Sequence, residues 1–199
     1  MYHGPMIKGS AARPVEHGVD RLFVDRWSPR AMSGEPIPLA ELQVLFEAAR
    51  WAPSAGNQQP WRILFGRRDT PEWPLFYELL NPGNRPWCLN AAALLLFISR
   101  MVNAEGRPIA THAYDTGAAW ENLALQGTLR GLVVHGMAGF NHELARDVLK
   151  IPADYHVNAM AAVGRPGRAE DLSESLQARE KPSPRKPLSE IVVEGAFRS

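Results

Sequence analysis

Two arginines and a serine are crowded into the segment Arg26-Trp27-Ser28-Pro29-Arg30. A guanidinium group presents a planar fork of donors that matches two phosphate oxygens at once, and a serine hydroxyl can add a further hydrogen bond. The segment stands between two predicted helices, so these groups would lie together in a loop. They indicate either a phosphate site or a solvated charged turn, and the motif alone does not separate the two.

A second segment, PSAGNQQPW at residues 53–61, combines small residues with carboxamides. The small residues leave backbone N–H groups open to a planar ligand, while Asn57 and Gln59 can each donate and accept hydrogen bonds. A flat heterocycle with alternating donors and acceptors along one edge would fit such a loop. The same letters also describe an ordinary helix stop, with Pro60 ending the helix and Trp61 packing beneath it.

The other candidates for chemistry are weak. Arg185, in PSPRKPLSE, is by itself one more basic residue in a basic tail. The six histidines lack metal-ligand spacing, no pair of carboxylates suggests hydrolysis, and no Walker loop, G-x-G-x-x-G or G-x-S-x-G motif is present. Cys88 lies beside an apolar stretch and is interpreted as inert core. Phosphate-type donors without an acid, base, nucleophile or metal ligand indicate that the chemistry belongs to a bound cofactor.

Composition narrows the class of protein. The chain has 199 residues, 45% of them apolar and 22% charged, which is typical of one globular domain. A net charge of +1 gives no reason to expect nucleic acid or an anionic membrane as a partner, so a small-molecule substrate is expected. A single cysteine excludes an intrachain disulfide, and no apolar run is long enough to span a bilayer. We therefore expect a cytoplasmic protein.

The elements that would position these residues can be placed coarsely. Residues 1–14 show no apolar period and are interpreted as a mobile leader, apart from the domain at 15–199. Val15, Val19, Leu22 and Phe23 recur at helical spacing and predict a helix that stops near Arg26. A second helix is expected from Pro38, with Leu42, Leu45, Phe46 and Ala49 on one side.

Four strands and a long helix are predicted after the 53–61 loop. RILFG at 62–66 and ALLLFIS at 93–99 have strand length, and the second is apolar on both faces and therefore central. GLVVHG at 131–136 and VNAMAAVG at 157–164 are two further strands. The helix at 113–130 carries many small residues, which let another backbone come close.

The last third of the chain is expected to cover the surface. Asn141 is a plausible cap for a helix that runs to Leu149. From Arg165 onward the sequence is polar and rich in proline until LSEIVV at 188–193, which is predicted to add an edge strand.

Taken in order, these segments resemble the FMN-dependent nitroreductase family. Its members read Arg-x-Ser-x-Arg/Lys near the start and Pro-Ser-x-x-Asn-x-Gln-Pro-Trp about two dozen residues later. NRPWCLNAAALLLF, YDTGAAWENLALQGTLRGL, HGMAGFNHELARDVLKIP and RKPLSEIV are similar to later family segments, so the resemblance covers roughly Val15 to Val193. Each motif alone is weak, but these six in the right order are specific.

The resemblance implies an α+β fold, with a mostly antiparallel central sheet flanked by helices, in an intertwined homodimer. Two FMN sites would lie at the interface between the subunits. Pro53, Ser54, Ala55 and Asn57 would reach across to the FMN held by the other chain.

The resemblance also implies roles within one chain. Arg26, Ser28 and Arg185 would hold the FMN phosphate, Arg30 would lie toward the ribityl chain and the N1/C2 side of the ring, and backbone at 137–139 would face the ring. The implied cofactor-binding set is Arg26, Trp27, Ser28, Arg30, Pro53, Ser54, Ala55, Asn57, Gln59, Asn84, Met137, Ala138, Gly139 and Arg185.

The implied reaction is a ping-pong transfer of hydride from NADH or NADPH, through N5 of the flavin, to an electron-poor acceptor such as a nitroaromatic or a quinone. Two alternatives stay open: a flavin-binding carrier or redox sensor with little turnover, and a specialised branch that dehalogenates, desaturates or breaks down flavin. Ala138 stands where many members carry Glu, and Trp87 and Ser183 where some carry Lys. The short segment from Ser99 to Thr111 is expected to leave the site open.

Overall fold

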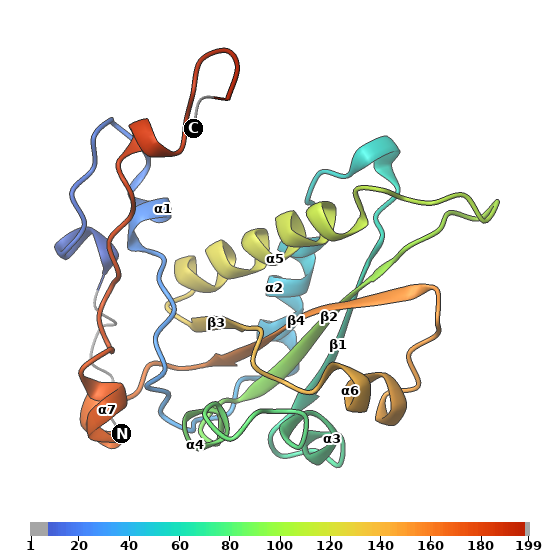
Figure 1. Cartoon of the computed structure of the whole chain (residues 1–199). Coiled ribbons are helices and arrows are strands. Elements are labelled where there is room, and N and C mark those ends of the chain that lie inside the picture. The colour runs from blue at the N-terminus through green and yellow to red at the C-terminus, as the bar shows by residue number, and fades with distance from the viewer. Residues whose placement is uncertain (1–7, 198–199) are drawn as a thin grey trace.

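The computed structural model describes residues 8–197, and an antiparallel sheet of four strands lies at its centre (Figure 1). The strand order is β1-β2-β4-β3, with β1 at Trp61–Arg67, β2 at Ala93–Arg100, β3 at Val133–Met137 and β4 at Tyr155–Gly164. Each neighbouring pair of strands is antiparallel. The predicted α+β fold and the four predicted strands are thus confirmed.

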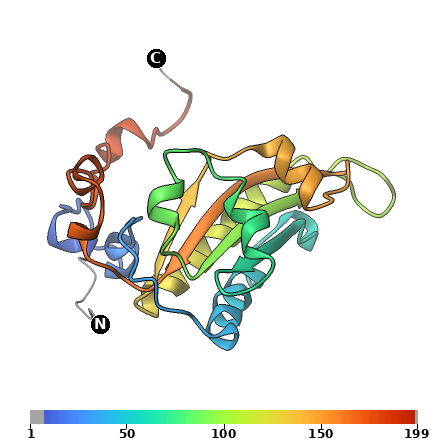
Figure 2. The same ribbon diagram turned by 90° about the horizontal axis from the view of Figure 1, so that it is seen from below.

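Helices cover both faces of this sheet (Figures 1 and 2). The longer pair, α2 and α5, packs on one face, whereas α3, α4 and α6 cover the other. The described helices are α1 at Arg21–Asp25, α2 at Leu39–Arg50, α3 at Trp73–Tyr77, α4 at Arg85–Cys88, α5 at His112–Leu129, α6 at His142–Val148 and α7 at Glu174–Gln177. Short 3-10 turns lie at Gly9–Ala11, Ala55–Asn57, Ala169–Asp171 and Leu188–Glu190.

Strand β2 is the centre of the core. Its residues from Ala93 to Ser99 are all buried, because alternate side chains enter the apolar layers on the two sides of the sheet. Leu94 and Leu96 join the layer beneath α3, α4 and α6, whereas Leu95 and Phe97 join the layer beneath α2 and α5. An unbroken apolar run therefore predicted a central strand correctly.

The small residues of α5 bring that helix close to the sheet at one position. A Cβ added to Gly127 would lie 2.5 Å from Cγ2 of Val134, so a larger residue there would push α5 away from β3.

The starts of helices α2 and α6 also agree with the sequence prediction. Pro38 precedes the first turn of α2, and the side chain of Asn141 accepts a hydrogen bond from the backbone N–H of Leu144 at 2.9 Å at the start of α6.

The helix predicted from Val15 to Arg26 is wrong over most of its length. Only Arg21–Asp25 is helical, because the Asp20 side chain accepts from Leu22 N at 2.8 Å and starts the helix there. Val15, Val19 and Phe23, the expected buried face, are about half exposed. Spacing alone therefore misjudged a segment whose apolar residues do not enter the core.

The edge strand predicted at residues 188–193 is also wrong within the described chain. Residues Leu188–Glu190 form a 3-10 turn, and Val192 N donates to Leu188 O at 2.9 Å, so the backbone closes on itself instead of pairing with a strand. The tail from residue 165 runs beside the N-terminal segment at one side of the sheet (Figures 1 and 2).

The described part of the predicted leader, residues 8–14, contains the turn Gly9–Ala11, and residues 1–7 lie outside the described range. No helix among residues 8–197 combines the length and apolar character that crossing a membrane requires.

Candidate functional site

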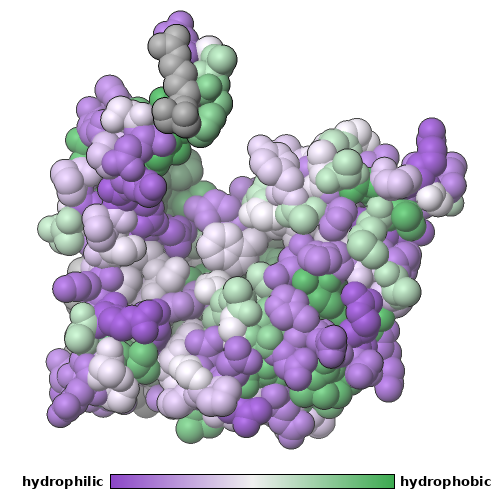
Figure 3. All heavy atoms as spheres, viewed as in Figure 1, coloured by the Kyte–Doolittle hydropathy of each residue, from purple (hydrophilic) through white to green (hydrophobic). Residues whose placement is uncertain are grey.

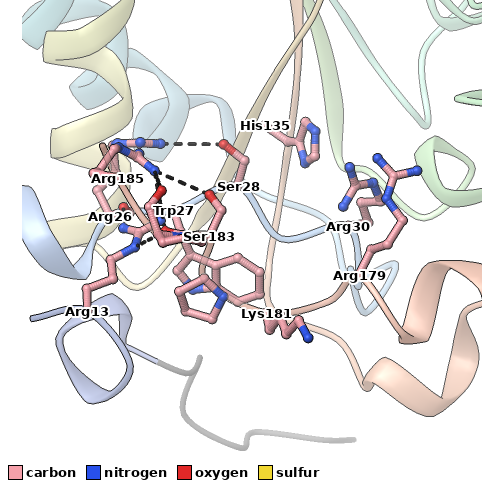
Figure 4. A pocket seen from close by; sticks show the side chains of 12 residues that line it. Arg13, Arg26, Trp27, Ser28, Arg30, His135, Arg179, Lys181, Ser183 and Arg185 are labelled. Atoms are coloured by element: carbon pink, nitrogen blue, oxygen red, sulfur yellow. Dashed lines mark hydrogen bonds between the residues drawn. The ribbon is translucent and has the colours of Figure 1, made fainter. Parts of the chain in front are cut away.

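A pocket of about 400 Å³ opens where the loop after α1 meets the tail (Figure 4). We call it the cationic pocket, because no carboxylate is among its lining side chains and six of them are basic: Arg13, Arg26, Arg30, Arg179, Lys181 and Arg185. Trp27, Ser28, His135 and Ser183 complete most of its wall. Figure 3 shows the surface hollowed between the terminal segments and the remainder of the molecule.

Arg26 is fixed by contacts on two sides. Its Nη1 donates to Ser28 Oγ at 3.4 Å, and its Nε lies 3.5 Å from a carboxylate oxygen of Glu121 on α5. Its guanidinium carbon is 6.0 Å from the ring centroid of Trp120, within reach of a cation–π interaction. Burial raises the pKa of the Glu121 carboxyl, and Arg26 opposes that shift. The guanidinium is therefore oriented before any ligand arrives.

Arg185 reaches the same end of the pocket from the tail. Its Nη1 donates to the hydroxyl of Ser183 at 3.2 Å and to the backbone oxygen of Pro184 at 3.1 Å. The positive charges crowd one another, because Arg185 and Arg26 both lower the pKa of Arg13, after the larger effect of burial. An anion bound among these groups would relieve their repulsion.

Arg13 is a pocket residue that the sequence did not indicate. Its Nη1 donates to the backbone oxygens of Val24 at 2.9 Å and Arg26 at 2.7 Å, and its Nε donates to Ser183 O at 2.8 Å. One side chain therefore joins the N-terminal segment, the Arg26 loop and the tail. No local pattern could reveal it, since its partners stand 11 to 170 positions away.

The opposite end of the pocket holds Arg30, Arg179 and His135 (Figure 4). Oε1 of Glu180 accepts hydrogen bonds from the backbone N–H groups of Arg30 at 2.7 Å and Ala31 at 2.8 Å, which fastens the tail to the loop. His135 Nδ1 lies 2.8 Å from Pro29 O, and burial lowers the pKa of His135 to about 4. The imidazole is therefore neutral at physiological pH.

A second cavity, also about 400 Å³, meets the cationic pocket at Ser28, which lines both. We call it the apolar cleft, because its wall is largely apolar: Phe97, Ala113, Thr116, Gly117, Trp120, Gly136, Met137, Ala138, Asn158 and Ala159. A Cβ on Gly136 would lie 2.8 Å from the Trp120 ring, so glycine lets the indole lie against β3.

Asn84 and Gly139 adjoin the cleft without lining either cavity. The Asn84 Nδ2 donates to Gly139 O at 2.9 Å, and its Oδ1 accepts from Trp87 Nε1 at 3.3 Å. A Cβ on Gly139 would lie 2.8 Å from that Nδ2. In the single chain this carboxamide therefore supports the backbone that follows Met137.

The 53–59 loop lies elsewhere. It is mostly exposed and lines neither cavity, and its backbone N–H at Ala55 donates to Asp115 Oδ2 at 3.2 Å. Gly56, Asn57 and Gln59 all have positive φ, a conformation that glycine and asparagine tolerate best. Pro53, Ser54, Ala55, Asn57 and Gln59 are thus separate from the remaining predicted residues within one chain, and a contact with a second protomer stays a prediction.

The structure therefore brings together two parts of the predicted set. Arg26, Trp27, Ser28, Arg30 and Arg185 share the cationic pocket, while Ser28, Met137 and Ala138 share the apolar cleft. Across the described residues, no group of three or more His, Cys, Asp and Glu could hold a metal ion. Cys88 is buried beside Met137, and burial raises the pKa of its thiol, as expected of inert core.

A model of the nitroreductase family matches residues 24–72, which include the Arg26 loop and the 53–61 loop. A protein of Rhodopseudomonas palustris, named as an NADH dehydrogenase/NAD(P)H nitroreductase, is 30% identical over 156 residues, covering 67% of this chain and 76% of the relative. This chain belongs to the nitroreductase family.

Other relatives of this nitroreductase-family chain extend the match. A solved structure described as an oxidoreductase containing FMN is 45% identical, with a TM-score of 0.90 and coverage of 94% of this chain and 96% of that one. A Streptomyces coelicolor protein, named as an NADH dehydrogenase/NAD(P)H nitroreductase, is 38% identical over 73 residues, which span only 35% of its length. The resemblance drawn from ordered motifs is confirmed.

Proposed function

We propose that this chain is an FMN-dependent oxidoreductase that takes its reducing equivalents from NADH or NADPH. The observation that carries the proposal is the adjacency of the two cavities, a strongly cationic pocket and an apolar cleft that share Ser28 as a lining residue. A ligand that joins a phosphate to a flat ring system has this same division between a charged end and an apolar body. The names of the relatives, which include FMN and NAD(P)H, support the same reading.

The donor set fits the phosphate end of FMN. Arg26 and Arg185 offer guanidinium groups, and the hydroxyls of Ser28 and Ser183 stand beside them. Hydrogen bonds between charged partners are roughly twice as strong as neutral ones. Glu121 pairs with Nε of Arg26 at 3.5 Å, and the lining of the pocket itself contains no carboxylate. We assign the phosphate to Arg26, Ser28 and Arg185, with Arg13 holding the backbone that carries them.

The apolar cleft fits the ring. Met137, Ala138 and the Trp120 indole provide flat apolar contact, while Arg30 and the Asn84–Gly139 pair lie toward its polar edge in our assignment. When bound, FMN supplies the hydride chemistry at its ring. The residues of this chain bind and orient the ring, hold positive charge near it, and leave space for a second planar molecule. We infer a ping-pong reaction whose acceptor is electron-poor, of the nitroaromatic or quinone type.

We further propose that the working unit is a homodimer. Large apolar side chains that a monomer would leave exposed include Val15, Val19, Phe23, Ile191 and Val192. The two segments that carry them meet where Leu188 N donates to Glu16 Oε1 at 3.0 Å, and exposed apolar side chains gathered in one place are typical of a protein interface. Within residues 8–197 the carboxamides of Asn57 and Gln59 bond to one another and not to side chains outside the exposed 53–59 loop. The loop would then reach the cofactor held by the other protomer.

The primary test is the absorption spectrum between 300 and 500 nm of the purified protein, before and after addition of FMN. A yellow protein that takes up FMN, oxidises NADH or NADPH under argon, and passes the electrons to a quinone or nitroarene supports the proposal. A colourless protein that binds no added FMN would contradict it. FMN binding without turnover of any acceptor would instead identify a flavin carrier or sensor.

The dimer has its own test. A mixed dimer that carries Asn57→Ala in one protomer should lose flavin at one site and keep it at the other. Normal FMN binding by a monomer would overturn the shared site while leaving the assigned cofactor intact. A cytoplasmic location, expected from the single cysteine, stays a prediction that fractionation can test.

A further inference from the structure

Five of the six basic side chains of the cationic pocket form two separate groups, and Lys181 belongs to neither. Arg13, Arg26 and Arg185 gather with the hydroxyls of Ser28 and Ser183 at one end, and Figure 4 shows Arg30 and Arg179 side by side at the other. His135 and Trp27 lie between these ends. We call the second group the Arg30–Arg179 centre.

The fold places Arg179 beside Arg30 by a specific link. One carboxylate oxygen of Glu180, the next residue in the chain, accepts hydrogen bonds from the backbone N–H groups of Arg30 and Ala31, at 2.7 and 2.8 Å. A tight turn at residues 179–181, in which the backbone N–H of Lys181 donates to the backbone oxygen of Arg179 at 2.9 Å, fixes the backbone around Glu180. The arrangement is thus held by three hydrogen bonds that leave both guanidinium groups unused.

The carboxylate of Glu180 balances only part of the positive charge of this centre. Among residues 8–197, neither the Arg30 nor the Arg179 guanidinium forms an ion pair or a hydrogen bond. Burial, and then the proximity of Arg179, lowers the pKa of Arg30, whereas Glu180 raises it. Because the nearby His135 is neutral, it adds no charge. Two unpaired like charges that face one cavity are most stable when a ligand supplies negative charge or carbonyl oxygens.

The two ends differ in the ligand group they suit. A phosphate has several oxygens to satisfy, and the Arg26 end offers guanidinium groups and two hydroxyls for them. The Arg30–Arg179 centre lacks a hydroxyl and lies near the aromatic ring of His135. Such surroundings suit the edge of a flat heterocycle that bears carbonyl groups.

We propose that Arg179 is a ligand-contacting residue that acts with Arg30 on the carbonyl-bearing edge of the flavin ring and not on the phosphate. This inference rests on the proposed function. The inference adds Arg179, a residue of the tail, to the site. The flavin ring gains negative charge at its carbonyl-bearing edge on reduction, and a second guanidinium there would stabilise that charge.

Riboflavin and FMN, which differ only in the phosphate, form the test. Dissociation constants for both are measured by flavin fluorescence with the unliganded full chain and its Arg179→Gln variant. Arg179→Gln should weaken both ligands alike, by about tenfold, the scale of a hydrogen bond to a charged group. Arg26→Gln should weaken FMN and leave riboflavin almost unchanged. Lys186→Gln, which removes the same charge from the tail outside the pocket, should change neither.

The outcomes separate cleanly. An Arg179→Gln variant that loses affinity for FMN alone would place Arg179 at the phosphate, and one that loses affinity for neither would make it a solvated surface residue; either result overturns the inference. Arg179→Lys, which keeps the charge, should keep the midpoint potential of bound FMN near that of the parent, whereas Arg179→Gln should lower it. If the parent protein bound neither FMN nor riboflavin, the proposed function itself would fail.

Discussion

The sheet with its helices and the cationic pocket are stabilised by different forces. In the sheet region, side chains such as Leu95 and Leu123 are completely buried, and apolar contact dominates. Apart from His135 on β3, the pocket is assembled from residues 13–31 and 179–185, which meet through charged side chains that form hydrogen bonds with backbone groups. Because of this difference, a mutation in the pocket can abolish ligand binding while the fold persists. Mutations in the sheet should instead lower the stability of the whole protein.

The largest effect is expected in the sheet. Leu95→Ala removes a fully buried side chain between β2 and α5, and should lower the free energy of unfolding by about 2–5 kcal/mol in urea titration. Leu188→Ala, on the exposed tail, is the control and should stay within about 0.5 kcal/mol of the parent. Equal losses in both variants would contradict the distinction between the regions.

Acid should act where the two regions meet, at His135. The pKa of this residue is lowered to about 4 in the folded protein, below its ordinary value of 6.5, so the unfolded chain binds the proton more readily. Stability is therefore complete above pH 6.5 and falls as the pH drops toward 4, by about 3 kcal/mol at most. His135→Gln should show a smaller loss between these pH values in denaturant titrations. An unchanged acid slope would exclude His135 as its source.

Arg26→Ala should affect the pocket and spare the sheet. We expect FMN binding to weaken by roughly 1.5 to 3 kcal/mol, the scale of hydrogen bonds to a charged group. The midpoint of urea unfolding of the unliganded protein should move less than in Leu95→Ala, because Arg26 pairs with Glu121 but is not part of either apolar layer. Isothermal titration with FMN gives the first quantity. Unaltered FMN affinity would remove Arg26 from the phosphate site.

Arg13→Gln should give the smallest effect, and the most local one. It removes hydrogen bonds to Val24, Arg26 and Ser183, and we expect FMN affinity to fall by about 1 kcal/mol. Hydrogen exchange should accelerate in the tail around Ser183 and stay slow in β2. Arg107→Gln, at an exposed loop ion pair, serves as the control. Faster exchange throughout the sheet would show that Arg13 supports the whole fold.

The sequence predicted the sheet region well, because local pattern decides it. The unbroken apolar run of β2 and the cap at Asn141 each follow from residues within a few positions. The same logic failed for Val15 and Val19, whose helical spacing is interrupted by Gly18 and the cap at Asp20. The same reasoning also failed at residues 188–193. Their composition is typical of a strand, but within the described chain they pair with no strand of the sheet.

The pocket was predictable only in part. The resemblance led to Arg26, Ser28 and Arg185, which the structure brings together, although their spacing alone left a charged turn as an equal alternative. Arg13 and Arg179 gave no signal. Their roles depend on contacts between the two ends of the chain, and a single sequence carries no record of such contacts.

The hydrogen bond from Nε of Arg13 to the backbone oxygen of Ser183 connects two residues that are 170 positions apart in the sequence. During synthesis on the ribosome, all four strands of the sheet have been made before the nascent chain supplies its half of the cationic pocket. A growing polypeptide can therefore bury its core well before it can bind a phosphate. Binding of the cofactor then becomes one of the last events in maturation.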